Sequence, residues 1–170
     1  QQFVDLDPAV VVAEYRRLYP HYTPSEVFFA ATTAGRSWRG AVEELEVRAA
    51  QGRNTWAYQL DWYPHTAEGE RLRAFHTLDI PLVFGNTGAS GAKTGDDASA
   101  RAMAAAMRDA LLAFARTGDP SHAGIPAWRP YAMDKRHTMV FDTSSRLEQD
   151  PRGGERRLYR QSPFIQRGTQ

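Results

Sequence analysis

The period of the apolar residues changes near residue 54, and this change limits the folds that the chain can adopt. Before it, apolar side chains recur at helical spacing, and we expect helices over 8–18, from 24 to about 35, and over 37–51. Over 54–62, large apolar residues alternate with smaller or polar ones, as in a strand with one large-residue face: Trp56, Tyr58, Leu60 and Trp62. The chain therefore combines helices with strands.

Residues that favour helix ends support the first three helices. Asp7 precedes Pro8, and Thr23 is followed by Glu26 three residues later, which is the pattern of a capping box. Gly52 follows the third helix, where glycine readily takes the left-handed conformation that ends a helix. Three short helices in a row are expected to pack on something larger.

The second half of the chain contains the strongest helix, over 96–117. It ends at Gly118, and its expected inner stripe consists of Ala102, Met103, Ala106, Ala110, Leu111 and Phe114. The preceding stretch, 87–97, is rich in Gly, Ser and Asp and is expected to be a mobile surface loop. A second strand over 138–142, a turn and a last short helix over 154–159 are expected to follow.

The composition excludes several classes of protein. The hydrophobic share is 42%, and 21 Lys and Arg against 20 Asp and Glu give no electrostatic reason to bind nucleic acid or an anionic membrane. The longest apolar runs are far shorter than the roughly 20 residues of a membrane span. The absence of cysteine excludes disulfides, cysteine catalysis and thiolate zinc sites, but it leaves the compartment open.

The segment over 73–86, RAFHTLDIPLVFGN, joins a histidine, an acid three residues later and an apolar run. It follows the first strand through a polar connection, 63–73, and α/β folds present functional groups on such loops. Histidine exchanges protons near neutral pH, so His76 is a candidate general base; the alternative is a loop histidine satisfied by local hydrogen bonds. Asp79 is a candidate triad acid, a residue that holds the histidine loop, or a surface or cap residue.

The order of these segments resembles the C-terminal part of the type-B carboxylesterases, a family that includes the bacterial para-nitrobenzyl esterases and the cholinesterases. The resemblance covers roughly residues 8–160. It is carried by four signatures that occur in the family's order: AFH with DIPLVF, then AFARTGDP, WRPY and MVFD.

This resemblance implies an α/β-hydrolase fold, of which residues 1–170 form the C-terminal portion, mostly helical with a few strands. It implies a serine carboxylesterase that hydrolyses small-molecule esters through an acyl-serine intermediate, without metal or cofactor. His76 matches the catalytic histidine, and Asp79 matches an acid that we expect to hold the histidine loop. Thr77 departs from the glycine often found after the histidine and is expected to tune the pocket rather than abolish activity.

The resemblance also places the nucleophilic serine, the triad acid and the oxyanion loop upstream of Gln1. The chain is therefore expected to be a fragment that needs the N-terminal remainder of the same esterase as its partner and is inactive alone. One alternative is a non-catalytic, esterase-like domain that binds proteins, because the family contains members that have lost triad residues. Another is a small α+β domain that folds independently and exposes apolar surface prone to association.

Other candidate sites have simpler explanations. The near-elbow GASGA around Ser90 lacks its last glycine, and Lys93 lacks the preceding glycine of a phosphate-binding loop. Trp56, Tyr58 and Trp62 could line a pocket, but alternating aromatic residues on a strand usually belong to the core. The remaining histidines are expected at the surface and the C-terminal arginines on a solvated helix face: His21, His65, His122, His137, Arg152, Arg156, Arg157 and Arg160.

Overall fold

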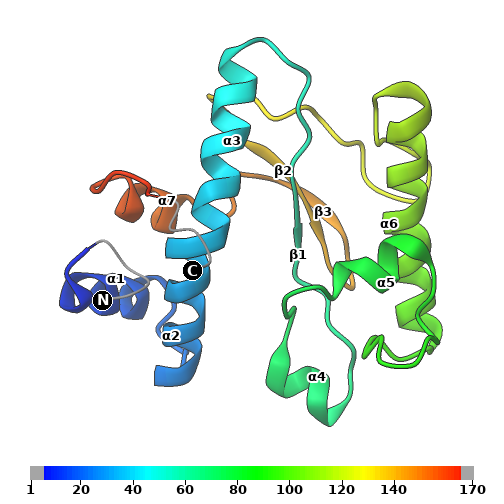
Figure 1. Cartoon of the computed structure of the whole chain (residues 1–170), viewed down its shortest axis with the longest axis horizontal. Coiled ribbons are helices and arrows are strands. Elements are labelled where there is room, and N and C mark those ends of the chain that lie inside the picture. The colour runs from blue at the N-terminus through cyan, green and yellow to red at the C-terminus, as the bar shows by residue number, and fades with distance from the viewer. Residues whose placement is uncertain (1–5, 166–170) are drawn as a thin grey trace. The chain divides into compact units, whose positions relative to one another are not determined.

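The structure, a computed structural model that describes residues 6–165, divides the chain into two units (Figure 1). The first, here called the helical unit, comprises residues 1–53 and 150–170. The second, here called the sheet unit, comprises residues 54–149 and contains all three strands of the described part. Each unit has its own hydrophobic core.

The helical unit begins with two helices whose caps are those that the sequence predicts. In α1, Pro8–Leu18, the Asp7 side chain accepts a hydrogen bond from the backbone of Ala9 at 2.9 Å. In α2, Pro24–Thr33, Thr23 and Glu26 form the reciprocal bonds of a capping box. The capping predictions are confirmed because both sites follow from local hydrogen bonding alone.

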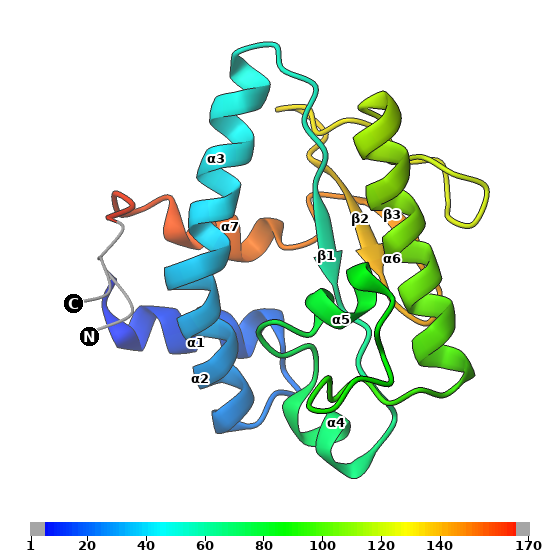
Figure 2. The ribbon, with the colours of Figure 1, turned by 45° about the vertical axis from the view of Figure 1, so that its right-hand side comes forward.

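The expected break between the second and third helices does not occur. Five π-helical residues, η1 over Ala34–Trp38, join α2 to α3, Arg39–Ala50, in one continuous helix (Figures 1 and 2). The backbone N–H of Arg39 bonds to the carbonyl of Ala34, so the wider turn keeps its backbone paired across Gly35. Gly52, with φ of 69°, follows the end of α3 as predicted.

The last helix, α7, spans Gly153–Tyr159 and agrees with the predicted segment within one residue. It supplies part of the core of the helical unit, whose buried residues are Val11, Tyr15, Val27, Ala31, Ala34, Leu158 and Tyr159. Helices from both ends of the chain therefore build this unit together.

The sheet unit contains a three-stranded sheet in the order β1-β2-β3. β1, Tyr58–Leu60, pairs in parallel with β2, His137–Phe141, which pairs antiparallel with β3, Arg146–Gln149. β2 agrees with the predicted second strand. The sequence missed β3, where only a turn was expected, because its side chains RLEQ include a single apolar residue and its pairing is a matter of backbone bonds with β2.

The first strand is shorter than predicted. The large residues of 54–62 were expected to form one face, but they are not buried together. Trp62 is buried, but Tyr58 is 49% exposed. The opposite face is also covered, because Thr55 and Ala57 are buried. Strands of parallel pairs are commonly covered on both faces, and strict alternation is then a poor guide to burial.

Three helices lie in the connection between β1 and β2. α4, Ala67–Leu72, occupies part of the expected polar connection, and Thr66 caps it by accepting from the backbone of Gly69 at 3.0 Å. α5 spans Asp79–Phe84 and packs against α6, Ala98–Thr117. Figures 1 and 2 show α5 near the carboxyl end of β1, between that strand and α6.

The predicted helix α6 is confirmed, with Asp97 as its N-cap and Gly118 in the left-handed conformation at its end. Its inner stripe was only partly correct: the buried residues are Ala100, Met103, Ala104, Met107 and Ala110. Leu111 and Phe114 are exposed. Alanine recurs on several sides of this helix, so the sequence alone does not select which stripe faces α5 and the sheet.

Candidate functional site

His76 lies in the turn that immediately precedes α5, and its side chain is exposed. Its neighbours fix this orientation: Phe75 packs against the core, and Leu78 is completely buried. Within residues 6–165, no hydrogen bond or ion pair is found for the His76 ring. The described residues therefore leave both ring nitrogens of this exposed side chain available to other groups.

The backbone around His76, here called the His76 loop (residues 73–78), is strained at both ends. Arg73 has φ of 56° and ψ of −149°, and Thr77 has φ of 73°. Residues other than glycine rarely adopt positive φ, and for a β-branched side chain it is a genuine outlier. Such residues cost of order 1–3 kcal/mol each, persist only where the surroundings hold them, and cluster at functional sites.

Arg73 is held from the N-terminal side. Its backbone N–H donates to Gly69 at 2.7 Å, and its guanidinium donates to Glu70 at 3.0 Å and to the hydroxyl of Tyr63. The guanidinium also lies 4.9 Å from the centre of the Tyr63 ring. A Cβ on Gly69 would lie 1.8 Å from the carbonyl oxygen of Pro64, so only glycine permits this close turn. These contacts fix the start of the His76 loop.

Asp79 follows the loop on its C-terminal side, as the first residue of α5. Its Oδ2 accepts a hydrogen bond from the hydroxyl of Tyr58 on β1 at 3.0 Å. Partial burial, and then the nearby carboxylate, raise the pKa of Tyr58 to about 12. Among the hydrogen bonds of the described residues, Asp79 is joined to β1 and not to His76. Its role as a support of the loop stays a prediction.

The backbone at Thr77 supplies a physical reason for the glycine expected at this position. Glycine takes φ near 73° without a steric penalty, whereas threonine does not. The expected tuning of a substrate pocket by Thr77 stays a prediction.

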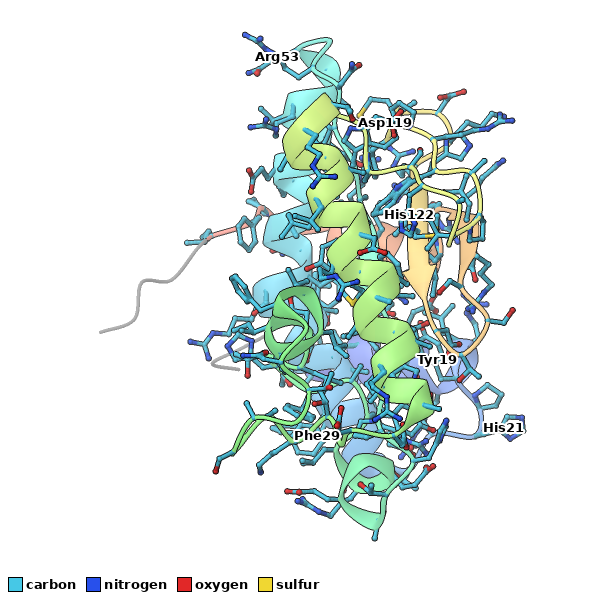
Figure 3. The ribbon with its side chains drawn as sticks, turned by 90° about the vertical axis from the view of Figure 1, so that its right-hand side faces the viewer. Tyr19, His21, Phe29, Arg53, Asp119 and His122 are labelled. Carbon is cyan, nitrogen blue, oxygen red and sulfur yellow. The ribbon has the colours of Figure 1, made fainter. Side chains whose placement is uncertain are left out.

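Of the other histidines, His122 is not a plain surface residue. Its Nδ1 accepts from the backbone of Gly124 at 3.1 Å, so its Nε2 carries the proton and donates to the carbonyl of Ala106 at 3.0 Å. Figure 3 labels it in the loop after α6, where it ties that loop to the helix. His21, also labelled in Figure 3, and His65 are exposed, as predicted. His137 is half-buried on β2.

The loop after α5 has neither of the two sites that its sequence suggests. Ser90 is exposed, and the segment before it is a helix, α5, rather than the strand of a nucleophile elbow. Lys93 pairs with Glu68 at 2.9 Å. The loop is also less exposed than predicted, because Thr87 and Thr94 are buried and the Thr94 hydroxyl donates to the carbonyl of Thr87 at 3.0 Å.

The aromatic residues near β1 belong mainly to the core. The indole of Trp62 is buried and donates to the hydroxyl of Ser99 at 3.0 Å. Trp56 donates to the carbonyl of Gly118 at 3.0 Å and packs edge-on against Trp128. Tyr58 is the most exposed of the three, and its hydroxyl bonds to Asp79.

The predicted solvated face of the C-terminal arginines is wrong for Arg152 and Arg156. Arg152 forms two bonds, of 2.7 and 2.5 Å, with the carboxylate of Glu155, which is 1% exposed. Tyr19 donates to the same carboxylate at 2.6 Å, and Tyr15 donates to its other oxygen. We call these four residues the Glu155 cluster. Arg156 is largely buried and pairs with Asp150 at 2.6 Å. The acidic partners of both arginines are local in sequence, but the burial of Glu155 depends on Tyr15 and Tyr19, which lie 140 and 136 residues away.

Burial and the adjacent carboxylate raise the pKa of Tyr15 and Tyr19 far above the usual value for tyrosine. These hydroxyls therefore remain donors under ordinary conditions. Every oxygen of Glu155 is bonded, which is the arrangement of a structural group rather than of a reactive one.

Two further properties concern only the part of the chain that the structure describes. In residues 6–165, no three His, Asp or Glu side chains converge in a way that could hold a metal ion. No helix of these residues has the length and apolar character needed to cross a membrane.

Comparisons with known proteins give one consistent result. A model described as the carboxylesterase family matches residues 27–158. The para-nitrobenzyl esterase of Bacillus subtilis (strain 168) is 28% identical over 141 residues, which are 82% of this chain and 28% of that protein. The phenmedipham hydrolase of Pseudarthrobacter oxydans is 31% identical over 88 residues, which are 49% of this chain and 18% of that protein.

Solved structures agree with these sequence relatives. The crystal structure of a Geobacillus stearothermophilus carboxylesterase matches with a TM-score of 0.79 and 30% identity, over 93% of this chain and 33% of that one. A para-nitrobenzyl (PNB) esterase structure matches with a TM-score of 0.67 and 27% identity, over 89% of this chain and 32% of that one. The predicted α/β class is confirmed, and the chain spans about a third of these structures.

Proposed function

Because the chain belongs to the carboxylesterase family, we propose that His76 is the general base of a serine carboxylesterase. The observation that carries this proposal is the His76 loop itself. An exposed imidazole, which forms no hydrogen bond or ion pair with residues 6–165, stands between two strained residues, Arg73 and Thr77. The segments on both sides are held by hydrogen bonds. Strain that a fold maintains next to a histidine favours a functional role for that histidine.

The proposed reaction uses two proton transfers. The imidazole of His76 takes the proton of a serine hydroxyl as the serine oxygen attacks the ester carbonyl. The protonated ring then donates to the leaving alcohol, which leaves an acyl-serine ester. In the second half, His76 takes a proton from water, which attacks the acyl group, and returns that proton to the serine. No metal or cofactor takes part in these steps.

We propose that the serine, the triad acid and the oxyanion donors come from a part of the protein that precedes residue 1. The sequence supports this because its one near-elbow, at Ser90, follows a helix, and because relatives are about three times as long as the chain. The sheet unit also has a surface suited to such a partner. β1 is an edge strand of the described sheet, where another strand could pair. The apolar residues Ile80 and Phe84, on α5, are 51% and 72% exposed.

The test uses the longer protein, with the residues encoded upstream of this chain. Hydrolysis of p-nitrophenyl butyrate is measured for the unaltered protein and for His76→Ala, in which kcat is expected to fall by about 10⁴-fold or more. His21→Ala is the matched control, because His21 is also exposed but lies in the helical unit. Its activity is expected to be unchanged.

Three results would contradict the proposal in different ways. Nearly full activity of His76→Ala would show that another group is the base. Ester hydrolysis by the purified 170-residue chain, lost on His76→Ala, would show that the partners of His76 lie within it. A longer protein that folds but hydrolyses no ester would favour the non-catalytic, protein-binding alternative.

A further inference from the structure

We infer that Tyr58 is a positioning residue for His76 and acts through Asp79; this inference rests on the proposed function. The hydroxyl of Tyr58, on β1, donates to Oδ2 of Asp79 at 3.0 Å. Asp79 is the first residue of α5 and stands three residues after His76. This hydrogen bond ties the segment that carries His76 to the sheet.

The Tyr58 side chain is a rigid donor because the sheet holds both its backbone and its ring. In the parallel pairing, Tyr58 is opposite Met139, which is completely buried. The ring of Tyr58 packs edge-on against Phe141, with centroids 6.1 Å apart. A tyrosine has only two side-chain torsions, so these contacts leave little freedom for its hydroxyl.

The residues between His76 and Asp79 couple the position of Asp79 to that of His76. They are only Thr77, whose backbone is left-handed, and Leu78, which is completely buried. The backbone N–H of Ile80 also bonds to the carbonyl of Thr77 at 3.2 Å. A displacement of Asp79 would therefore move the strained turn on which His76 stands, rather than being absorbed by a flexible linker.

The bond to Tyr58 is a side-chain restraint on the C-terminal side of the loop, as the bonds of Arg73 to Glu70 and Tyr63 are on the other side. A general base must meet the hydroxyl that it deprotonates within a few tenths of an ångström, and a misplacement of 1 Å can cost about 100-fold in rate. A loop that is strained at Thr77 depends on such restraints.

The experiment compares variants of the longer protein in hydrolysis of p-nitrophenyl butyrate. Tyr58→Phe removes the hydroxyl but keeps the ring against Phe141. We expect kcat to fall about 10-fold, with KM changed by less than about two-fold, because the base is misplaced while the substrate site remains. Asp79→Ala is expected to lower kcat to a similar extent, and the double variant to lower it no further, because both changes break one interaction.

Asp79→Asn distinguishes positioning from an effect of charge. The amide oxygen can still accept from Tyr58, so most of kcat is expected to return, without the carboxylate charge. A loss in Asp79→Asn equal to that in Asp79→Ala would overturn the inference, because the charge would then be what matters. Tyr22→Phe, in the helical unit, is the matched control and is expected to keep full activity.

The outcomes also separate this inference from the proposed function. If His76→Ala is inactive but Tyr58→Phe keeps its kcat, positioning by Tyr58 is wrong and the function stands. If His76→Ala remains active, the proposed function fails and the inference fails with it. If KM rises as much as kcat falls, Tyr58 shapes the substrate site instead, which also overturns the positioning role.

Discussion

Each unit of this protein contains a carboxylate that accepts from tyrosine, and the two sites differ in their surroundings. In the helical unit, Glu155 is buried and bonded to Tyr15, Tyr19 and Arg152. In the sheet unit, Asp79 accepts from the half-exposed Tyr58, and the nearby His76 is exposed, without a hydrogen bond or ion pair to any of residues 6–165.

This difference separates a structural network from a candidate reactive site. A buried carboxylate whose oxygens are all bonded can leave its place only at a large cost in free energy. An exposed imidazole on a strained loop has the opposite character, because its orientation is maintained while its ring nitrogens stay free for other groups. The same residue types therefore serve stability in one unit and, we propose, catalysis in the other.

The largest expected effect comes from breaking the Glu155 cluster. Glu155→Ala removes the acceptor of two tyrosine hydroxyls and leaves the mostly buried guanidinium of Arg152 without its carboxylate. We expect the free energy of unfolding to fall by about 3–5 kcal/mol, measured by urea denaturation. The control is Arg17→Ala, which breaks an exposed ion pair with Glu14 and should have no measurable effect. An equal effect of the two substitutions would show that the cluster is not structural.

The tyrosines of both sites predict a loss of stability at alkaline pH. The folded protein raises the pKa of Tyr15 and Tyr19 strongly and that of Tyr58 to about 12, from an ordinary value of 10.0. The tyrosine hydroxyls therefore stay protonated to a higher pH in the folded state than in the unfolded state. Their contribution to the free energy of unfolding is complete below pH 10.0 and decreases as the pH rises above it. Urea denaturation at a series of pH values measures this decrease.

The two sites should contribute unequally to that decrease. Tyr15→Phe is expected to reduce the fall of the unfolding free energy at alkaline pH more than Tyr58→Phe does. The reason is that Tyr15 is completely buried and Tyr58 is half-exposed. Equal reductions would contradict the contrast between the two sites. The absorbance of tyrosinate on titration gives an independent measure of which hydroxyls resist ionisation.

A smaller effect concerns the strain of the His76 loop. Thr77→Gly replaces a β-branched residue at φ of 73° by one that adopts this conformation freely. Removal of the strain stabilises the folded state by more than the added backbone freedom of glycine stabilises the unfolded chain. The free energy of unfolding is therefore expected to rise by about 0.5–1 kcal/mol. Thr143→Gly, at a turn threonine outside the positive-φ residues, is the control and should not stabilise. A decrease for Thr77→Gly would show that the loop is not strained there.

The parts of the fold that could be predicted are those that local interactions decide. The caps at Asp7 and Thr23 and the glycine ends at Gly52 and Gly118 need only neighbouring backbone groups, and all four are found as predicted. Two predictions were wrong: a helix break at Gly35, and only a turn where β3 lies. In both places backbone hydrogen bonds outweigh the preferences of the side chains.

The candidate site divides in the same way. The pattern of residues 73–86 was sufficient to single out His76 and Asp79 from the sequence. The sequence did not indicate that Tyr58 bonds to Asp79, because 21 residues separate them and only the placement of β1 beside α5 brings them together. Neither did it indicate Glu155 as the centre of a buried cluster, since its tyrosine partners lie 136 and 140 residues away.

The sequence by itself determined the family, the α/β class and the helix ends at Asp7, Thr23, Gly52 and Gly118, and it singled out His76 as a candidate. Those properties depend on short patterns in which the groups that form hydrogen bonds and apolar contacts lie within a few residues of each other. The tertiary structure alone decided which stripe of α6 is buried, which tyrosines bond to Glu155, and that Tyr58 holds the C-terminal side of the His76 loop. Such choices depend on contacts between distant segments, whose free energies no local pattern contains.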